Sequence, residues 1–286
     1  PRHGVRRQRQ MCIRDSIEAE EISAKFRSKP IHINAINLDE VISPQKGDSV
    51  VEVIRNNLRA VKEQSERLER PIIAHVNHPN FHYAISAKDL AEAIEEQFFE
   101  VYNGHPNINH LGNEDHPGDQ ALWDMANTLR LVVHKAPPLF GVATDDSHTY
   151  HGGNTSPGRG WIMVRAKELT AGSLIAAMEE GDFYASSGIT LEEVVFDERR
   201  DVYRITIQPS EGASFETRFI GTRKSTPETP GEVLATVKGT EASYQLTGDD
   251  LYVRAVITSS RPHPNPSYKD QFEQAWTQPV GWRKNR

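Results

Sequence analysis

The sequence predicts an α/β domain followed by a small antiparallel β domain. From Ile17 to about Ser187, short apolar runs alternate with amphipathic helical patterns, as in chains that alternate strands and helices. From about Ile189, short runs of alternating apolar and polar residues follow one another, separated by turn residues and without a helical pattern. We therefore predict a first domain over residues 17–188 and a β-sandwich-like domain over residues 189–286.

Apolar runs and breaker residues define the elements of the first domain. We expect strands at residues 30–38, 71–76, 98–104, 140–144 and 160–166. Asp48 or Ser49 caps a helix that reaches about Arg70, and Ser86 with Asp89 forms a capping signal for a helix to about Gln97. Further helices are expected at about residues 120–135 and after Thr170.

Composition excludes two classes of partner. The formal net charge is −7 and no basic block lies inside the predicted domains, which argues against binding to nucleic acid. No window approaches the roughly 18 consecutive apolar residues that a membrane span needs. Ten of the twelve histidines lie between His32 and His151, so we expect the chemistry in this part of the chain, with a small molecule as substrate.

The first sixteen residues stand apart from the rest. The stretch RRQRQMCIRDS (Arg6 to Ser16) corresponds codon by codon to a transposase-based sequencing adapter. We interpret residues 1–16 as translated adapter, to be excluded from fold reasoning; the alternative is a basic, disordered N-terminal arm. Cys12, the single cysteine, lies inside this stretch and offers no disulfide partner.

Polar side chains follow the predicted strands where each strand ends. In parallel α/β architectures these ends gather on one face, and sites are built there. Mixed imidazole and carboxylate ligands suit Zn²⁺, Mn²⁺ or Fe²⁺, and a pair of such ions activates water and clamps an oxyanion. The candidate metal ligands are Glu21, His32, His75, His78, Glu100, Asp146 and His148.

Each candidate also has an ordinary structural explanation. A single histidine at a strand end is usually a satisfied polar side chain, and His78 to Asn80 can be plain turn chemistry. Glu100 can bond backbone amides, and Asp145 is best explained as a cap of the following loop. We treat four more histidines mainly as loop residues: His105, His110, His116 and His151. The concurrence of the seven candidates, more than any single motif, favours a metal site.

Four motifs together resemble one family of enzymes. EVYNGHP, GVATDDSH, PGRGWIMVRA and GDFYASSG are similar to the PHP (polymerase and histidinol phosphatase) family of metal-dependent hydrolases, in its carbaryl-hydrolase-like branch. The resemblance covers about Glu18 to Gly188. It implies a distorted (β/α)₇ barrel with two or three divalent metal ions.

The resemblance also implies roles for single residues. Glu21 would bridge two metals, and His32 with His78 or His75 would complete one of them. Asp146 would ligate the other. His148 would serve a third metal position or orient the nucleophilic water. Arg159 would steady negative charge on the substrate, or else be a solvated loop residue.

One departure from the family pattern matters. The family's first strand carries an H-x-H motif followed by an Asp and a His, and no such strand precedes Glu21. We therefore expect a chain truncated at its N-terminus, in which the metal held by Glu21, His32 and His78 keeps its protein ligands. The full-length parent would carry two or three metal ions in a complete barrel. In this chain the barrel would lack its first strand.

Two functions follow from these observations. The first is a metal-dependent hydrolase that directs a metal-bound hydroxide at a phosphoester or at a carbamate or amide-type bond. The second is a degenerate metal-binding scaffold, whose C-terminal β domain binds carbohydrate or a partner. In that domain Tyr252, Trp276 and Trp282 would form an aromatic platform, or else pack in the core or at a sheet edge, which is the interpretation we favour.

Overall fold

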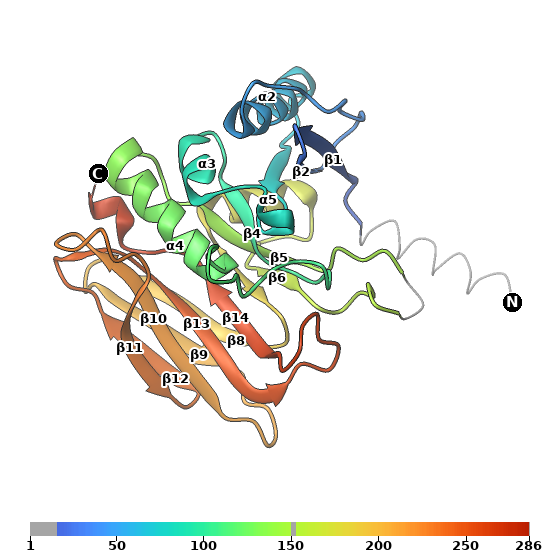
Figure 1. Cartoon of the computed structure of the whole chain (residues 1–286). Helices are drawn as coiled ribbons and strands as arrows, with labels where there is room; N and C mark the ends of the chain where they lie inside the picture. The colour runs from blue at the N-terminus through green and yellow to red at the C-terminus, as the bar shows by residue number, and fades with distance from the viewer. Residues whose placement is uncertain (1–15, 150–152, 286) are drawn as a thin grey trace, which may run out of the picture.

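The computed structural model describes residues 16–149 and 153–285 (Figure 1). Within these ranges the chain forms three β-sheets and four α-helices. The predicted (β/α)₇ barrel is wrong, because no sheet of the described residues closes on itself and strands outnumber helices. The predicted adapter segment falls outside the described residues except for Ser16, and so does the loop histidine His151.

The first sheet is mixed, with strand order β1-β2-β3-β4-β5. Its strands are β1 (Ala19–Phe26), β2 (Lys29–Ile36), β3 (Ile73–Val76), β4 (Phe98–Asn103) and β5 (Phe140–Thr144). β1, β2 and β3 pair antiparallel, and only β3, β4 and β5 run parallel. Two residues connect β1 to β2, far fewer than the crossover that a parallel pair requires. This hairpin is the physical reason why the barrel prediction failed.

The second and third sheets pack face to face. The second has the order β11 (Glu232–Lys238), β10 (Phe215–Arg223), β13 (Asp250–Pro262), β14 (Phe272–Thr277), β7 (Phe183–Ser186) and β6 (Trp161–Val164), all antiparallel. The third is β12 (Glu241–Gln245), β9 (Val202–Ile207) and β8 (Leu191–Asp197). Buried residues of both sheets form one apolar core. Since β6 and β7 join the second sheet, that sheet contains strands from both sides of the boundary predicted at residue 188.

The three aromatic residues of the alternative carbohydrate-binding platform are all buried. Tyr252 is 0 %, Trp276 2 % and Trp282 6 % exposed. Trp276 stacks on Tyr102 of β4, with ring centroids 5.5 Å apart. They are therefore core residues, and they offer no surface to a carbohydrate.

Four α-helices cover the sheets: α2 (Val50–Leu68), α3 (Ala87–Glu92), α4 (Asp119–Leu129) and α5 (Ala171–Glu180). Ser49 is the N-cap of α2, and its side chain accepts a hydrogen bond from the Glu52 backbone N–H. Ser86 and Asp89 form the predicted capping box of α3. The buried face of α2 packs on the apolar face of β1 and β2.

Helix α3 ends at Glu92, five residues before the predicted end. The buried guanidinium of Arg130 donates hydrogen bonds to the carbonyl oxygens of Leu90 and Ala93, which a helix reaching Gln97 would use itself, and to that of Glu96. Arg130 opens a π-helical turn, Arg130–His134, that follows α4. A distant cation therefore terminates this helix, which no local pattern in the sequence reveals.

Helix α4 joins the first sheet to the second (Figure 1). On one side Trp123 packs against Phe99 of β4, with ring centroids 5.7 Å apart. On the other side the carboxylate of Asp124 accepts hydrogen bonds from the Arg254 guanidinium (Nε, 2.8 Å) and the Tyr252 hydroxyl (2.7 Å), both on β13. The side chains of the Asp124–Arg254 pair are 3 % and 1 % exposed. This buried ion pair fixes the C-terminal sheets against the site-bearing half.

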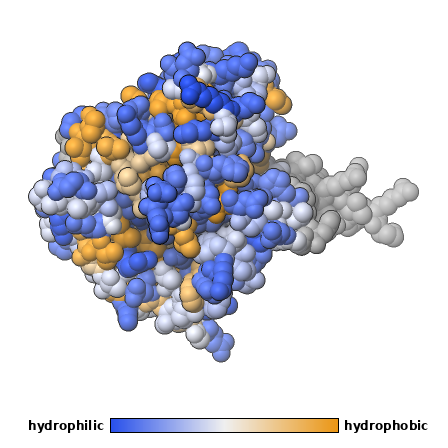
Figure 2. Space-filling model, in the orientation of Figure 1, coloured by the Kyte–Doolittle hydropathy of each residue, from blue (hydrophilic) through white to orange (hydrophobic). Residues whose placement is uncertain are grey.

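None of the described helices is long and apolar enough to cross a membrane. The face shown in Figure 2 is mostly hydrophilic, with hydrophobic residues in small separate groups. Single exposed apolar side chains, such as Val41 and Leu169, are normal for a globular surface.

Asp124→Asn should lower the free energy of unfolding by about 3–5 kcal/mol, since it leaves the Arg254 guanidinium buried without its counter-charge. Glu95→Gln, which breaks the exposed pair with Arg55, is the matched control and should cost less than about 1 kcal/mol. Urea denaturation followed by circular dichroism measures both. A cost for Asp124→Asn as small as that of Glu95→Gln would contradict the assigned role of the buried pair.

Candidate metal centre

The β1–β2 hairpin presents Glu21 and His32 on one face because strand side chains alternate. Ile22 and Ala24 on β1, with Ile31 and Ile33 on β2, point into the core under α2. The residues between them therefore point the other way. In the hairpin register Ser23 lies opposite His32, so Glu21 is a diagonal neighbour of His32. The His32 Nδ1 lies 2.9 Å from the Glu21 Oε1.

His78 reaches the same carboxylate from the third strand. It follows the C-terminal end of β3, and its Nε2 lies 3.4 Å from the Glu21 Oε1. The ring of His78 meets that of His32 edge to face, with centroids 5.1 Å apart. Glu21, His32 and His78 thus offer three ligand atoms that all lie within 4.8 Å of one another. Among the described residues no other group of three or more His, Cys, Asp or Glu meets this condition.

The three side chains fit a divalent metal ion. Ligand atoms about 2.1 Å from a tetrahedral ion lie roughly 3.4 Å from each other, close to the 3.4 Å between His78 and Glu21. Two imidazoles and one carboxylate leave at least one coordination position open, as catalytic zinc sites and non-haem iron sites do. The triad could therefore receive an ion if its ligand atoms, which all lie within 4.8 Å of one another, moved to tetrahedral separations.

Charge already favours such an ion. Hydrogen bonds from His32 and His78 hold the pKa of Glu21 well below its usual range, so the carboxylate is ionised at neutral pH. Burial alone would lower the pKa of His78, but the hydrogen bond to Glu21 and nearby carboxylates outweigh burial and raise it. A cation would replace the protons that these imidazoles otherwise share with Glu21.

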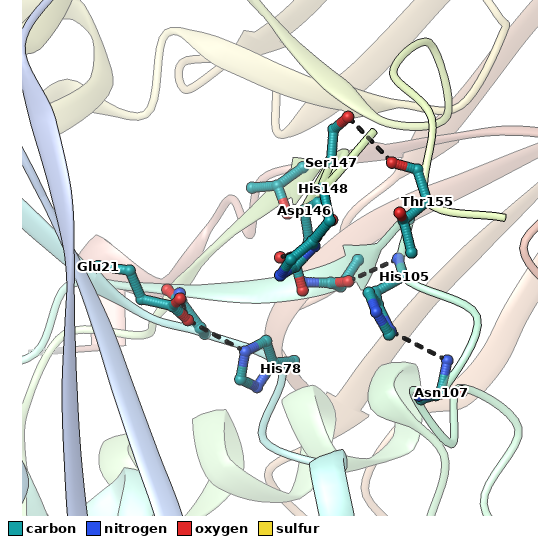
Figure 3. A network of polar contacts seen from close by, with 12 residues as sticks. Glu21, His78, His105, Asn107, Asp146, Ser147, His148 and Thr155 are labelled. Carbon is teal, nitrogen blue, oxygen red and sulfur yellow. Dashed lines mark hydrogen bonds and ion pairs between the residues drawn. The ribbon is translucent and has the colours of Figure 1, made fainter. Parts of the chain in front are cut away.

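The triad forms one wall of a pocket of about 110 Å³. Asp146 and His148, which follow β5, and His105, which follows β4, stand around the same space (Figure 3). The complete lining is Glu21, His32, His78, Phe81, His105, Ile108, Asp146 and His148. The parallel arrangement of β3, β4 and β5 brings their carboxyl ends together here, as the sequence predicted for these strands.

His148 and His105 present opposite hydrogen-bonding characters. The Nδ1 of His148 lies 2.9 Å from the carbonyl oxygen of Asp146, so Nδ1 carries the proton and Nε2 is left as an acceptor. The Nδ1 of His105 accepts a hydrogen bond from the Asn107 backbone N–H at 3.2 Å, so in the neutral ring Nε2 carries the proton. The two rings meet edge to face, with centroids 5.3 Å apart. The pocket therefore holds one imidazole acceptor and one imidazole donor.

Glu100 lies beneath the pocket and not in its lining. It is 2 % exposed and accepts hydrogen bonds of 2.7 Å from the His78 backbone N–H, the Asn103 side chain and the Thr144 hydroxyl. Burial raises its pKa. Since these donors satisfy both oxygens, Glu100 positions the ends of β3, β4 and β5, and the structure does not bring it into the triad.

His75 and Arg159 also stay out of the pocket lining. His75 is 4 % exposed on β3, and its Nδ1 has no hydrogen-bond partner. Arg159 is 3 % exposed, and its guanidinium donates to the carbonyl oxygens of Gly104 and Asn154 and to the side chain of Asn265. These hydrogen bonds make Arg159 a connection between loops, and it does not line the pocket.

The loop after β5 is closed by Asp145, as the sequence indicated. Its Oδ1 accepts hydrogen bonds from the backbone N–H groups of Arg159 (2.6 Å) and Gly160 (3.0 Å). This leaves Asp146 as the carboxylate of the GVATDDSH motif that lines the pocket.

His105 is the pocket residue that sequence reasoning undervalued. Its sequence context predicts mainly a loop histidine, yet it follows the end of β4 by two residues, as His78 follows β3 and Asp146 follows β5. The same spacing from a parallel strand was the available signal.

Unusual backbone conformations cluster around the pocket. Four non-glycine residues there have positive φ: His78 (22°), His82 (52°), Tyr83 (50°) and Asp146 (46°). Such conformations cost energy and persist where the surrounding structure holds them, often at functional sites. Two of the four line the pocket.

Comparison of the sequence with protein-family models finds no match, and comparison with curated proteins finds none either. The resemblance to the PHP family therefore stays a prediction from motifs. The chemistry of the site has to be inferred from its residues and their geometry.

His78→Gln should weaken Zn²⁺ binding by more than the ~10–100-fold that loss of an outer-shell partner causes, because it removes one of three ligands. His75→Gln should leave the affinity within a few-fold of wild type. Isothermal titration of the metal-stripped protein compares the two variants. Equal losses would show that the triad is assigned to the wrong histidine.

Acid should destabilise the protein partly through His75. Burial lowers its pKa to about 4, whereas the unfolded chain binds a proton below about 6.5. The protonation of His75 therefore does not affect the free energy of unfolding above pH 6.5. Below that pH the free energy of unfolding falls as pH approaches 4, by at most about 3 kcal/mol, because the unfolded chain binds the proton more tightly. His75→Phe should flatten this part of the pH profile, measured by urea denaturation at pH 7, 5.5 and 4.5. An unchanged slope in the variant would refute the assignment.

Proposed function

We propose that the protein is a metal-dependent hydrolase. The observation that carries this proposal is the Glu21–His32–His78 triad, with its ligand atoms within 4.8 Å, on one wall of a pocket that also holds Asp146, His148 and His105. A purely structural cluster would not need an acceptor and a donor imidazole facing the same open space.

Glu21, His32 and His78 would hold a divalent ion, with Zn²⁺, Mn²⁺ and Fe²⁺ as the candidates that suit this donor set. When bound, the ion supplies an activated water at neutral pH and polarises the electrophile. Asp146 and His148 lie on the far side of the pocket, where they would act on a second ion or directly on water.

The protein's own groups have complementary tasks in hydrolysis. The Nε2 of His148 accepts a proton from water, and the Asp146 carbonyl that holds its Nδ1 fixes the ring orientation. The Nε2–H of His105 donates a hydrogen bond to the oxygen or nitrogen that leaves. Burial lowers the pKa of His105, which keeps this ring in its neutral form.

The lining also bears on the substrate. None of the described residues that line the pocket is Lys or Arg, and Phe81 and Ile108 form an apolar portion of the wall. A phosphate monoester would bring two negative charges beside Glu21 and Asp146, and only the bound ion and the imidazoles of the lining would offset them. We therefore propose carbamate, amide or ester bonds as preferred substrates over phosphomonoesters.

The test is hydrolysis by protein reconstituted with Zn²⁺ or Mn²⁺, using aryl carbamates, aryl esters, phosphodiesters and aryl phosphates. Turnover should be abolished by chelation and restored by metal. His148→Ala should lower kcat by roughly 10²–10⁴-fold, the usual contribution of a general base. His116→Ala, which alters an exposed histidine stacked on Tyr83, should not change kcat. No turnover of any substrate by fully loaded protein would refute the proposal.

A further inference from the structure

Asn77 contacts every part of the triad. It lies between β3 and His78 and is 4 % exposed. Its side-chain Nδ2 donates to the Glu21 Oε1 at 2.9 Å. Its backbone N–H donates to the carbonyl oxygen of His32 at 3.0 Å, and His78 is the next residue in the chain. One residue therefore connects the three candidate ligands, which come from three different strands or strand ends.

Hydrogen bonds with Asn34 fix the orientation of the Asn77 side-chain amide. The Oδ1 accepts the backbone N–H of Asn34 at 3.1 Å, which only an oxygen can do. The second proton of Nδ2 goes to the Asn34 Oδ1 at 3.0 Å. Asn34 lies directly opposite Glu21 in the hairpin register. With both protons of Nδ2 used, the amide cannot flip without losing all three hydrogen bonds.

We propose that Asn77 is the positioning residue of the metal centre, which orients the Glu21 carboxylate towards the ion. Asn77 binds Oε1, the same oxygen that His32 and His78 approach, and so restrains the position of this candidate ligand oxygen. The inference rests on the proposed metal site. Outer-shell partners of this kind typically contribute 10–100-fold to metal affinity.

Asn57 provides a matched control for a purely structural role. Like Asn77 it is buried, with 0 % exposure, and its amide makes three hydrogen bonds, to Gln45 twice and to the Val53 carbonyl oxygen. It braces the start of α2 and makes no hydrogen bond to the triad. Replacement of either asparagine by Ala removes three side-chain hydrogen bonds. Only the bonds of Asn77 include one to a candidate metal ligand, Glu21.

The experiment is calorimetric titration of the metal-stripped protein with Zn²⁺ and with Mn²⁺, together with thermal melting of the wild type and of each variant. Asn77→Ala should raise Kd by about 10–100-fold. Asn34→Ala, which keeps the backbone N–H but removes one support of the amide, should raise Kd by a smaller factor. Asn57→Ala should lower Tm and leave Kd within twofold of wild type.

The outcomes separate this inference from the proposed function. Wild-type Kd in both Asn77→Ala and Asn34→Ala overturns the positioning role and leaves the metal site intact. An equal loss in Asn57→Ala also overturns it, because affinity would then follow stability alone. If the wild-type chain binds neither ion, the metal site and the positioning role fail together. Should Asn77→Ala not fold, Asn34→Ala and Asn57→Ala decide the question.

Discussion

The buried carboxylate of Glu100 is the interaction on which the site depends. It ties the second residue after β3, the end of β4 and the end of β5 to one point through His78, Asn103 and Thr144. A buried carboxylate costs free energy unless it accepts hydrogen bonds. The need of Glu100 for these bonds therefore fixes the three strand ends relative to one another. These hydrogen bonds position both walls of the pocket, because His78 lies on one wall and the segment after Thr144 carries Asp146 and His148 on the other.

The second half of the site is brought by a different element, the β1–β2 hairpin. Its apolar face packs under α2. Because side chains alternate between the two faces of a strand, Glu21, His32 and Asn34 lie on the opposite face. Asn77 links this hairpin to β3 by hydrogen bonds to Glu21 and Asn34. The candidate metal centre thus lies at a junction between antiparallel and parallel parts of one sheet.

The C-terminal sheets support the site without contributing to its lining. The Asp124–Arg254 pair and the Tyr102–Trp276 stack fix them to α4 and β4. The side chain of Asn265, between β13 and β14, accepts hydrogen bonds from Arg159, which in turn holds Gly104 beside His105. The loop that carries the donor imidazole is therefore braced by a segment more than 150 residues away in the chain.

Local features could be predicted from the order of the residues: the caps at Ser49 and Ser86, the antiparallel strands after residue 189, and the polar residues at strand ends. These depend on neighbours a few residues apart, which a sequence displays directly. Other features appear only in the folded protein: β1 and β2 form a hairpin instead of barrel strands, and His78 approaches Glu21 while His75 is buried away from the pocket lining. The tertiary structure also turned Arg159 and Glu100 from candidate site residues into anchors. The side-chain contacts join segments that are distant in the chain, so no spacing in the sequence reveals them. The β1–β2 hairpin is local, with a connection of two residues, but the apolar runs of the sequence predict no strand before the one at residues 30–38.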